Sequence, residues 1–256
     1  MDIKQFNLDE NTYLKYRDTP WDEKSLGLGT VEITEIQGDL EPNLHQLIQF
    51  FDNYQKLKNK QLAYCRVRSS QQNIARALQQ NGYYFVETSF NIGIHNLKSL
   101  DFHQKYKKIL PLREPYDEEY LEIENIAKNS FHYGRFHEDV SIDQVAARER
   151  YKNWVRDMRD QGKPFLVYVD KGVLISFISF MYTDDSIELI LGGSKEGYGA
   201  YSPFFWASFL TRFKQLGVNK ISTLISASNI SIVNLYSSFG FTVKETLFGF
   251  HKRYSR

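Results

Sequence analysis

The stretch SASNISIVNLYSSFGF, residues 226–241, decides the fold class of this chain. It predicts a helix from Ser228 to Phe239, which Gly240 stops. The preceding segment NKISTLIS (219–226) predicts a strand, and further strands are expected from Phe241 to Tyr254. A strand, a helix and a strand in succession are typical of an α/β protein.

The residues before this stretch extend the same pattern. A glycine-bearing loop (192–199) follows a run of strands and leads into an expected helix at Ala200–Leu216. Lys171-Gly172 and Asp184-Asp185 are expected to be turns between those strands. The other expected elements of this half are helices over 117–131 and 141–159 and strands over 164–170, 173–182 and 186–192. This order predicts a mixed central sheet flanked by helices.

The first half of the chain predicts a smaller α/β (α+β) domain. The polar stretch 96–111 suggests a domain boundary, which divides residues 1–105 from residues 106–256. Residues 1–28 carry turn formers and are expected to be a short lead-in. The expected elements are strands over 30–36, 62–68 and 83–94 and helices over 44–54 and 69–80.

Two segments of the chain resemble each other at an offset of 158 residues. ALQQNGYYFVET (77–88) matches LYSSFGFTVKET (235–246), with Gly82 opposite Gly240 and Glu-Thr at both ends. A strand and a helix are expected before each, which indicates a duplicated unit. The alternative is that any junction of helix, glycine and aromatic strand looks alike.

Composition limits the classes of function. The net charge is +1 and no basic block stands out, which argues against a nucleic-acid binder. One cysteine, Cys65, excludes an intrachain disulfide and fits a reducing compartment. The N-terminus lacks an apolar signal core, and the longest apolar stretch, 173–182, is roughly half of a membrane span. A soluble, cytoplasmic protein is expected.

The segment GGSKEGYGAYS (192–202) has the features of a phosphate-binding turn. It follows a strand and opens a helix, so its glycine amides and the helix N-terminus could face an anion. No Gly-Lys-Ser/Thr follows, and Gly197-Tyr198-Gly199 lacks the third glycine of a dinucleotide fingerprint. An ordinary strand-to-helix turn is the alternative.

This turn and the run 226–241 together resemble the GCN5-related N-acetyltransferase (GNAT) superfamily, and the resemblance covers residues 111–254. EGYGAY (196–201) is similar to its pyrophosphate loop, Arg/Gln-Gly-x-Gly-x-Gly, with departures at Glu196 and Tyr201. The run 226–241 is similar to its motif Asn-x6-Tyr-x3-Gly-Phe. The resemblance implies an acyltransferase that uses acetyl-coenzyme A (acetyl-CoA) as co-substrate.

A narrower resemblance, to the TDP-fucosamine N-acetyltransferase subfamily, covers nearly the whole chain. It rests on Pro20-Trp21-Asp22 with Gly27, on the incomplete first repeat, and on SFHYGRFHEDVSIDQVAARERYKNWV (130–155). It implies a truncated GNAT-like N-terminal domain, a catalytic GNAT domain, and transfer of acetyl to the amine of a TDP- or UDP-linked aminodeoxysugar. Such a reaction belongs to polysaccharide biosynthesis.

The resemblance also implies which residues hold the cofactor and which catalyse. Those that would contact the cofactor are Leu189, Leu191, Gly197, Gly199, Ala200 and Asn229. Tyr236 would be the general acid that protonates the leaving thiolate; the alternative is a core tyrosine. Glu188 is a candidate base, or a strand residue that faces solvent. Asn229 could also cap its helix.

His132, Arg135 and His137 are candidate acceptor-binding residues. They alternate with Phe131, Tyr133 and Phe136 in a segment between two helices, and rings with an arginine suit a nucleotide. A loop anchored by its aromatic residues is the alternative. The two histidines do not complete a known metal-ligand spacing, so no metal is expected.

Two further functions stay open. The chain could acetylate a peptide, an amino acid or an antibiotic amine, or it could be a GNAT-like module that binds without catalysis. The expected partner is a small molecule, neither nucleic acid nor membrane, and a homodimer is left open.

Overall fold

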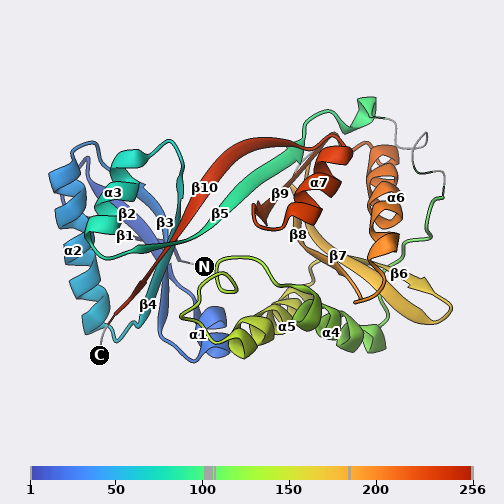
Figure 1. Cartoon of the computed structure of the whole chain (residues 1–256), viewed down its shortest axis with the longest axis horizontal. Helices are drawn as coiled ribbons and strands as arrows, with labels where there is room; N and C mark the ends of the chain where they lie inside the picture. Colours follow the sequence, from blue (N-terminus) through green and yellow to red (C-terminus); the bar gives the residue numbers. More distant parts are fainter. Residues whose placement is uncertain (1, 101–105, 107, 184–185, 255–256) are drawn as a thin grey trace. The chain divides into compact units, whose positions relative to one another are not determined.

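The structure is a computed structural model that describes residues 2–100, 106, 108–183 and 186–254. The chain divides into two compact units, each assembled from separate segments (Figure 1). Unit 1 comprises Met1–Ser89, Gly134–Ala147 and Glu245–Arg256, and unit 2 comprises Phe90–Tyr133 and Arg148–Lys244. The boundary expected after residue 105 falls outside the described residues and stays a prediction, as does the turn expected at 184–185.

Unit 1 is built on a mixed sheet. Its elements are β1 (Lys4–Asn7), β2 (Tyr13–Asp18), α1 (Pro20–Leu26), β3 (Thr30–Gln37), α2 (Glu41–Leu57), β4 (Leu62–Arg68), α3 (Gln72–Gln80) and parts of β5 (Tyr84–Ile94) and β10 (Thr242–Arg253). The strand order is β1-β2-β3-β4-β10-β5, with β3 and β4 parallel. Helices α2 and α3 bury an apolar face against these strands, where Leu44, Phe51 and Leu78 are inaccessible to solvent.

The lead-in expected over residues 1–28 is wrong, because this segment forms β1, β2 and α1. In β2, Leu14 and Tyr16 are buried beneath the sheet, while the residues between them are partly exposed. Pro20 occupies the first turn of α1 and Gly27 ends it in the left-handed conformation, at a φ of 65°. Both are recognised helix-boundary signals.

Unit 2 also has a mixed sheet flanked by helices, as expected. Its elements are η1 (Leu97–Ser99), η2 (Asp117–Glu119), α4 (Tyr120–Ser130), most of α5 (Gln144–Asp160), β6 (Phe165–Asp170), β7 (Val173–Thr183), β8 (Ser186–Ser194), η3 (Gly199–Tyr201), α6 (Ser202–Gln215), β9 (Lys220–Ser226), α7 (Ile230–Ser238) and parts of β5 and β10. Strands run in the order β5-β9-β8-β7-β6, with β8 and β9 parallel.

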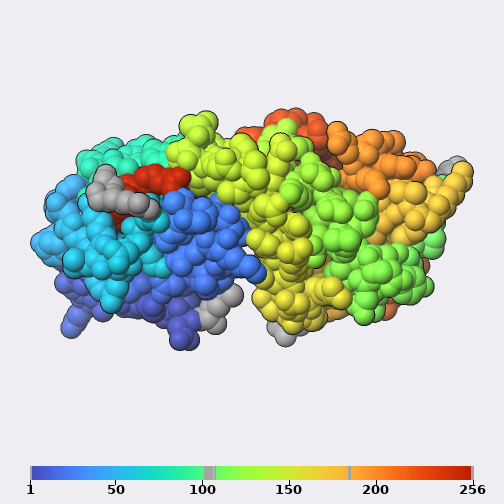
Figure 2. Space-filling view, turned by 90° about the horizontal axis from the view of Figure 1, so that it is seen from below, coloured from blue at the N-terminus to red at the C-terminus, as the bar shows by residue number. Residues whose placement is uncertain are grey.

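Two apolar cores cover the two faces of the unit 2 sheet. One packs α6 and α7 against the sheet through Phe205, Phe209 and Tyr236, and the other packs α4 and α5 through Ile123 and Val155. The outer surfaces of α4 and α5 are visible in the space-filling view (Figure 2). Among the described residues, every helix is too short or too polar to cross a membrane.

Helix α5 begins at Gln144 instead of the expected Ser141. The carboxylate of Asp143 accepts a hydrogen bond from the amide of Ala146 at 2.9 Å, so Asp143 satisfies the first turn. Ser141 lies outside the helix, where its hydroxyl contacts Tyr84 at 3.0 Å.

The last three elements of each expected repeat begin at a constant offset of 158 residues, since β5 and β10 also begin 158 residues apart, at Tyr84 and Thr242. β4 and β9 begin at Leu62 and Lys220, and α3 and α7 begin at Gln72 and Ile230; both differences are 158 residues. We call β3-α2-β4-α3-β5 the first copy and β8-α6-β9-α7-β10 the second copy. Such agreement over several elements supports duplication.

The two copies exchange their last strands. Strand β10, which ends the second copy, pairs with β4 of the first copy from Leu247 opposite Arg68 to Arg253 opposite Leu62. Strand β5, which ends the first copy, lies next to β9. Each unit is therefore completed by a strand from the other copy.

Candidate functional site

Strands β8 and β9 separate in the middle of unit 2. Their parallel ladder starts at Ser186 opposite Lys220 and ends at Glu188 opposite Ser222. Both strands continue further, β8 to Ser194 and β9 to Ser226. Backbone groups of β8 beyond residue 189 are thus left out of this ladder.

A bulge in β8 lies where the strands separate. Ser179 of β7 pairs with Leu191 and Phe180 pairs with Leu189, so Ile190 has no opposite residue. The extra residue turns neighbouring side chains to different faces: Leu189 joins the core beneath α6 and α7, whereas Leu191 joins the core beneath α4 and α5. A bulge that redirects a strand beside a site is a recurrent feature of active sites.

The turn after β8 presents exposed backbone. Gly197, Gly199 and Ala200 are exposed, and Gly197 has a φ of 82°, which favours glycine. A Cβ added at Gly197 or Gly199 would have nothing within 4 Å. The amides of these three donate to no backbone carbonyl in the described part of the chain, so they are available to bind an anion at the start of α6.

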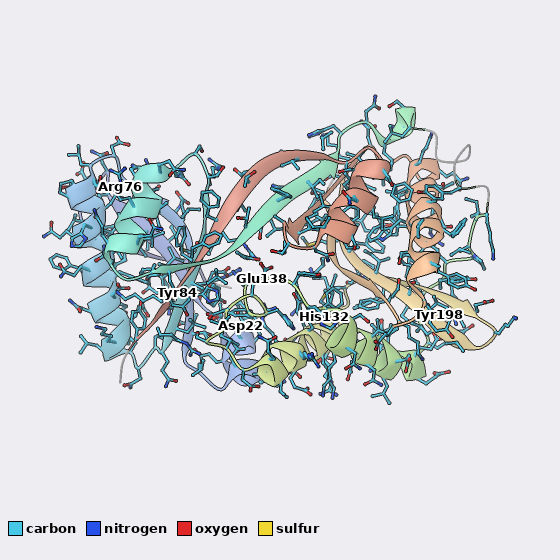
Figure 3. All side chains as sticks on the ribbon, in the orientation of Figure 1. Asp22, Arg76, Tyr84, His132, Glu138 and Tyr198 are labelled. Atoms are coloured by element: carbon cyan, nitrogen blue, oxygen red, sulfur yellow. The ribbon has the colours of Figure 1, made fainter. Side chains whose placement is uncertain are left out.

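Hydroxyl groups and an ion pair anchor this turn. Ser194 Oγ lies 2.8 Å from Ser176 Oγ and 3.1 Å from Ser202 Oγ, which ties β8 to β7 and to α6. Lys195 donates to Glu122 at 2.7 Å. The ring of Tyr198, labelled in Figure 3, lies 6.1 Å from that of Tyr201. The turn is held by several elements, so its amides are preorganised.

Asn229 caps helix α7. Its Oδ1 accepts a hydrogen bond from the amide of Ile232 at 3.3 Å. The cap that the sequence offered as one role of Asn229 is confirmed, while a contact between Asn229 and a cofactor stays a prediction.

Tyr236 is 5% exposed in the core beneath α6 and α7. Its ring lies 5.0 Å from that of Trp206 and 4.7 Å from that of Phe241. The hydroxyl has no hydrogen-bond partner among the described residues. Its oxygen is nevertheless not fully buried, so it reaches the edge of the core. Burial raises the pKa of Tyr236 well above its usual range, so the phenol keeps its proton at neutral pH.

Glu188 is exposed on β8, at the last pair of the ladder with β9. Among the described residues, its carboxylate has no ion-pair or hydrogen-bond partner. The side chain is therefore available, and its role as a base stays a prediction.

The first copy has the same bulge but a closed turn. In the pairing of β2 with β3, Lys15 faces Glu35 and Tyr16 faces Ile33, so one residue between them is unpaired, as in β8. Here, however, Asn73 donates to the carbonyl of Gly38 at 3.3 Å. A Cβ at Gly38 would lie 2.8 Å from the Leu44 side chain. Side chains of α2 and α3 thus lie against this turn in the first copy.

The three expected acceptor-binding residues fall in different units. His132 is exposed in unit 2 (Figure 3), whereas Arg135 and His137 belong to unit 1. Arg135 donates to Glu32 at 2.8 Å, and its guanidinium lies 4.2 Å from the ring centroid of Tyr64. The structure thus gives Arg135 partners within the protein.

Unit 1 also buries a charged cluster that the sequence did not predict. Asp139 Oδ2 lies 2.7 Å from His251 Nδ1 and accepts from the Tyr84 hydroxyl at 2.9 Å. Burial lowers the pKa of His251, and hydrogen bonds from His251 and Ser141 outweigh burial to lower the pKa of Asp139. A neutral imidazole thus donates to an ionised carboxylate. No local pattern signals this pair, because 112 residues separate its members.

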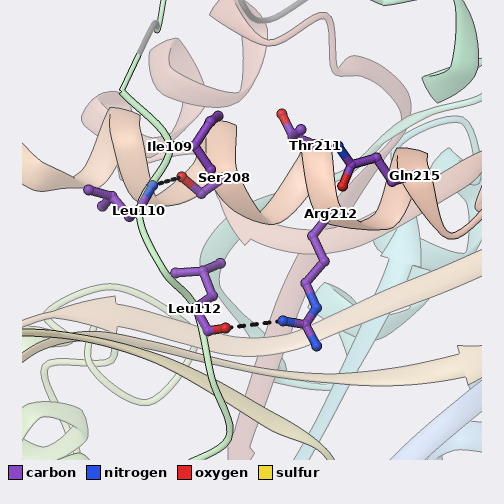
Figure 4. Close-up of a pocket in the computed structure, with 7 residues that line it drawn as sticks. All are labelled: Ile109, Leu110, Leu112, Ser208, Thr211, Arg212 and Gln215. Atoms are coloured by element: carbon purple, nitrogen blue, oxygen red, sulfur yellow. Dashed lines mark hydrogen bonds between the residues drawn. The ribbon is translucent and has the colours of Figure 1, made fainter.

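A pocket lies elsewhere on unit 2, where the segment 109–112 crosses α6 (Figure 4). The Leu110 amide donates to Ser208 Oγ at 2.8 Å, and Arg212 donates to the Leu112 carbonyl at 3.1 Å. These bonds fasten the segment to α6. None of the expected site residues lines this pocket.

Comparisons with known proteins support the fold. No family model matches the chain. It is 23% identical over 244 residues to the spore coat polysaccharide biosynthesis protein SpsD of Bacillus subtilis (strain 168), a match that covers 93% of this chain and 82% of SpsD.

Two solved structures extend this comparison. A GCN5-related N-acetyltransferase from Sphaerobacter thermophilus matches with a TM-score of 0.67 at 12% identity, covering 95% of this chain and 76% of that one. A tandem GNAT protein from the clavulanic acid biosynthesis pathway matches with a TM-score of 0.61 at 11% identity, covering 96% and 79%. The expected GNAT fold is confirmed.

Proposed function

We propose that the chain is an N-acetyltransferase that moves the acetyl group of acetyl-CoA to the amine of a nucleotide-linked aminosugar. One observation carries the proposal: in the second copy the ladder between β8 and β9 ends after Glu188 and exposed glycine amides follow β8, whereas in the first copy Asn73 and Leu44 cover the matching turn. An extended pantetheine arm needs backbone partners, and its diphosphate needs amides at a helix N-terminus. Both requirements meet in the second copy.

The chemistry asks for an oxyanion donor, a base and an acid. The backbone amide near Leu191 would donate to the oxygen of the thioester carbonyl as the amine attacks its carbon. As the carbon–sulfur bond breaks, Tyr236 would give its proton to the thiolate. The proton lost by the amine would pass to Glu188 or to water. Burial raises the pKa of Tyr236, so the phenol is protonated at neutral pH and carries the proton that this step needs.

The choice of acceptor rests on a relative. SpsD is named a spore coat polysaccharide biosynthesis protein, and its match with this chain spans both halves. A sugar amine fits that setting better than a peptide. Among the expected acceptor residues, His132 is the one in unit 2 that is exposed and available.

Two measurements test the proposal. Saturating acetyl-CoA should raise the melting temperature, since a ligand at 100 times its dissociation constant stabilises by about 2.7 kcal/mol. A panel of TDP- and UDP-aminosugars, peptides and aminoglycosides, followed by thiol release, should show turnover with a nucleotide aminosugar. Turnover with peptides or antibiotics alone would mean that the acceptor is not a nucleotide aminosugar. Binding of acetyl-CoA without turnover would favour a non-catalytic module.

A further inference from the structure

The two copies differ by one pair in their parallel ladders. In the first copy, the ladder between β3 and β4 continues to the pair Ile33–Cys65. The matching pair of the second copy is Leu189 with Thr223, counted from the first pair of each ladder. The ladder of the second copy ends just before this pair.

The Thr223 side chain binds the Leu189 carbonyl, which would accept a backbone hydrogen bond if the Leu189–Thr223 pair formed. Its Oγ1 donates to the carbonyl oxygen of Leu189 at 3.2 Å, and the residue is 8% exposed. A side-chain donor that binds a strand carbonyl competes with the backbone ladder for it. Cys65, at the matching place in the first copy, carries a thiol, which is a weak donor, and there the ladder continues.

We propose that Thr223 is a positioning residue that keeps β8 and β9 apart and so sets the inner end of the acetyl-CoA gap. The inference rests on the proposed function. Because Thr223 already donates to the Leu189 carbonyl, we expect the pantetheine arm to find its partners on β8 beyond it, from Ile190 onward. Leu189 then packs its side chain in the core beneath α6 and α7, whereas Leu191 offers its backbone groups to the pantetheine arm.

Substitutions at this position separate the hydroxyl from the shape of the side chain. Thr223→Val keeps the volume and removes the donor, and Thr223→Cys reproduces the first copy. Both should raise KM for acetyl-CoA by about tenfold, the effect of one hydrogen bond, and should leave kcat within about twofold. Thr223→Ser should restore the KM. The matched control is Thr211→Val on α6, whose buried hydroxyl has no partner among the described residues, and it should behave as wild type.

Backbone hydrogen exchange provides a readout that needs no activity. In Thr223→Cys the ladder should gain a pair, so amides across 189–191 and 222–225 should exchange more slowly than in wild type. Wild-type KM in Thr223→Val, no rescue by Thr223→Ser, or unchanged exchange in Thr223→Cys would each overturn the inference. If wild-type protein fails to bind acetyl-CoA, the proposed function falls instead, and the exchange measurement still decides whether Thr223 holds the strands apart.

Discussion

Arg135 Nη1 lies 2.8 Å from Glu32 Oε1 within unit 1, and both side chains are nearly buried. Arg17 holds the second carboxylate oxygen of Glu32 at 2.7 Å. The Arg135 guanidinium also lies over Tyr64, 4.2 Å from the ring centroid. A lysine ammonium group could not both pair with the Glu32 carboxylate and stack on the Tyr64 ring as this planar guanidinium does.

Arg135→Gln should therefore destabilise the fold. Glu32 would keep Arg17 but lose one of its two guanidinium partners, and losing a hydrogen bond to a charged group costs about 1.5–3 kcal/mol. Urea unfolding at pH 7 would measure the loss. Arg148→Gln, a change at an exposed arginine, is the control and should cost less than about 0.5 kcal/mol. An Arg135→Gln protein of normal stability with a raised KM for the acceptor would instead place Arg135 in the acceptor site.

The same pair predicts how stability depends on pH. Burial alone would raise the pKa of Glu32, but the charges of Arg135 and Arg17 lower it to about 2. A carboxyl with a depressed pKa stabilises the folded state above its unfolded pKa, roughly 4.3, and loses this contribution as pH falls toward 2. The difference in unfolding free energy between wild type and Glu32→Gln should thus shrink from pH 5 to pH 2. A difference that stayed constant over this range would exclude ionised Glu32 as its source.

Local sequence patterns were sufficient for the elements that form the gap. The expected strand over 219–226 and helix over 228–239 correspond to Lys220–Ser226 and Ile230–Ser238, because apolar spacing and Gly240 act within a few residues. Strand β2 was missed, since the six residues YLKYRD carry three charges and the burial of Leu14 depends on its partner strands.

Contacts between residues far apart in the chain could not be predicted from local sequence patterns. Arg135 is 103 residues from Glu32, and Thr223 is 34 residues from Leu189. The exchange of β5 and β10 between copies likewise depends on pairing across the chain. Each residue type is compatible with many environments, so only the folded chain shows whether an arginine meets a ligand or a carboxylate.

Tyr236→Phe tests the proposed general acid. The substitution keeps the ring among Trp206 and Phe241 and removes a hydroxyl that has no partner among the described residues. The fold should therefore keep its stability, while kcat should fall about 10²- to 10⁴-fold and affinity for acetyl-CoA should stay nearly unchanged. Tyr168→Phe, at another buried tyrosine, is the control. Normal turnover in Tyr236→Phe would remove this tyrosine from the mechanism.

Gly199→Ala tests whether the turn before α6 holds a diphosphate. Gly199 is not among the positive-φ residues and its Cβ would meet no protein atom, so the melting temperature should not change. A methyl group at this exposed position would nevertheless keep a phosphate from the amides, and we expect affinity for acetyl-CoA to fall about tenfold. Titration calorimetry with acetyl-CoA measures the affinity. Unaltered binding would mean that the diphosphate lies elsewhere.

Asn229 can act as a helix cap, as a cofactor ligand, or as both, and two substitutions distinguish these roles. Asn229→Ala should lower the unfolding free energy by about 1 kcal/mol, because the amide of Ile232 loses its acceptor. Asn229→Ser keeps an oxygen that caps equally well but removes the side-chain amide, so its stability should match wild type. If the amide of Asn229 also binds the cofactor, KM for acetyl-CoA should rise in both variants. If Asn229→Ser instead restores KM together with stability, capping is the whole role of this residue, and the cofactor must be held by β8 and the glycine turn.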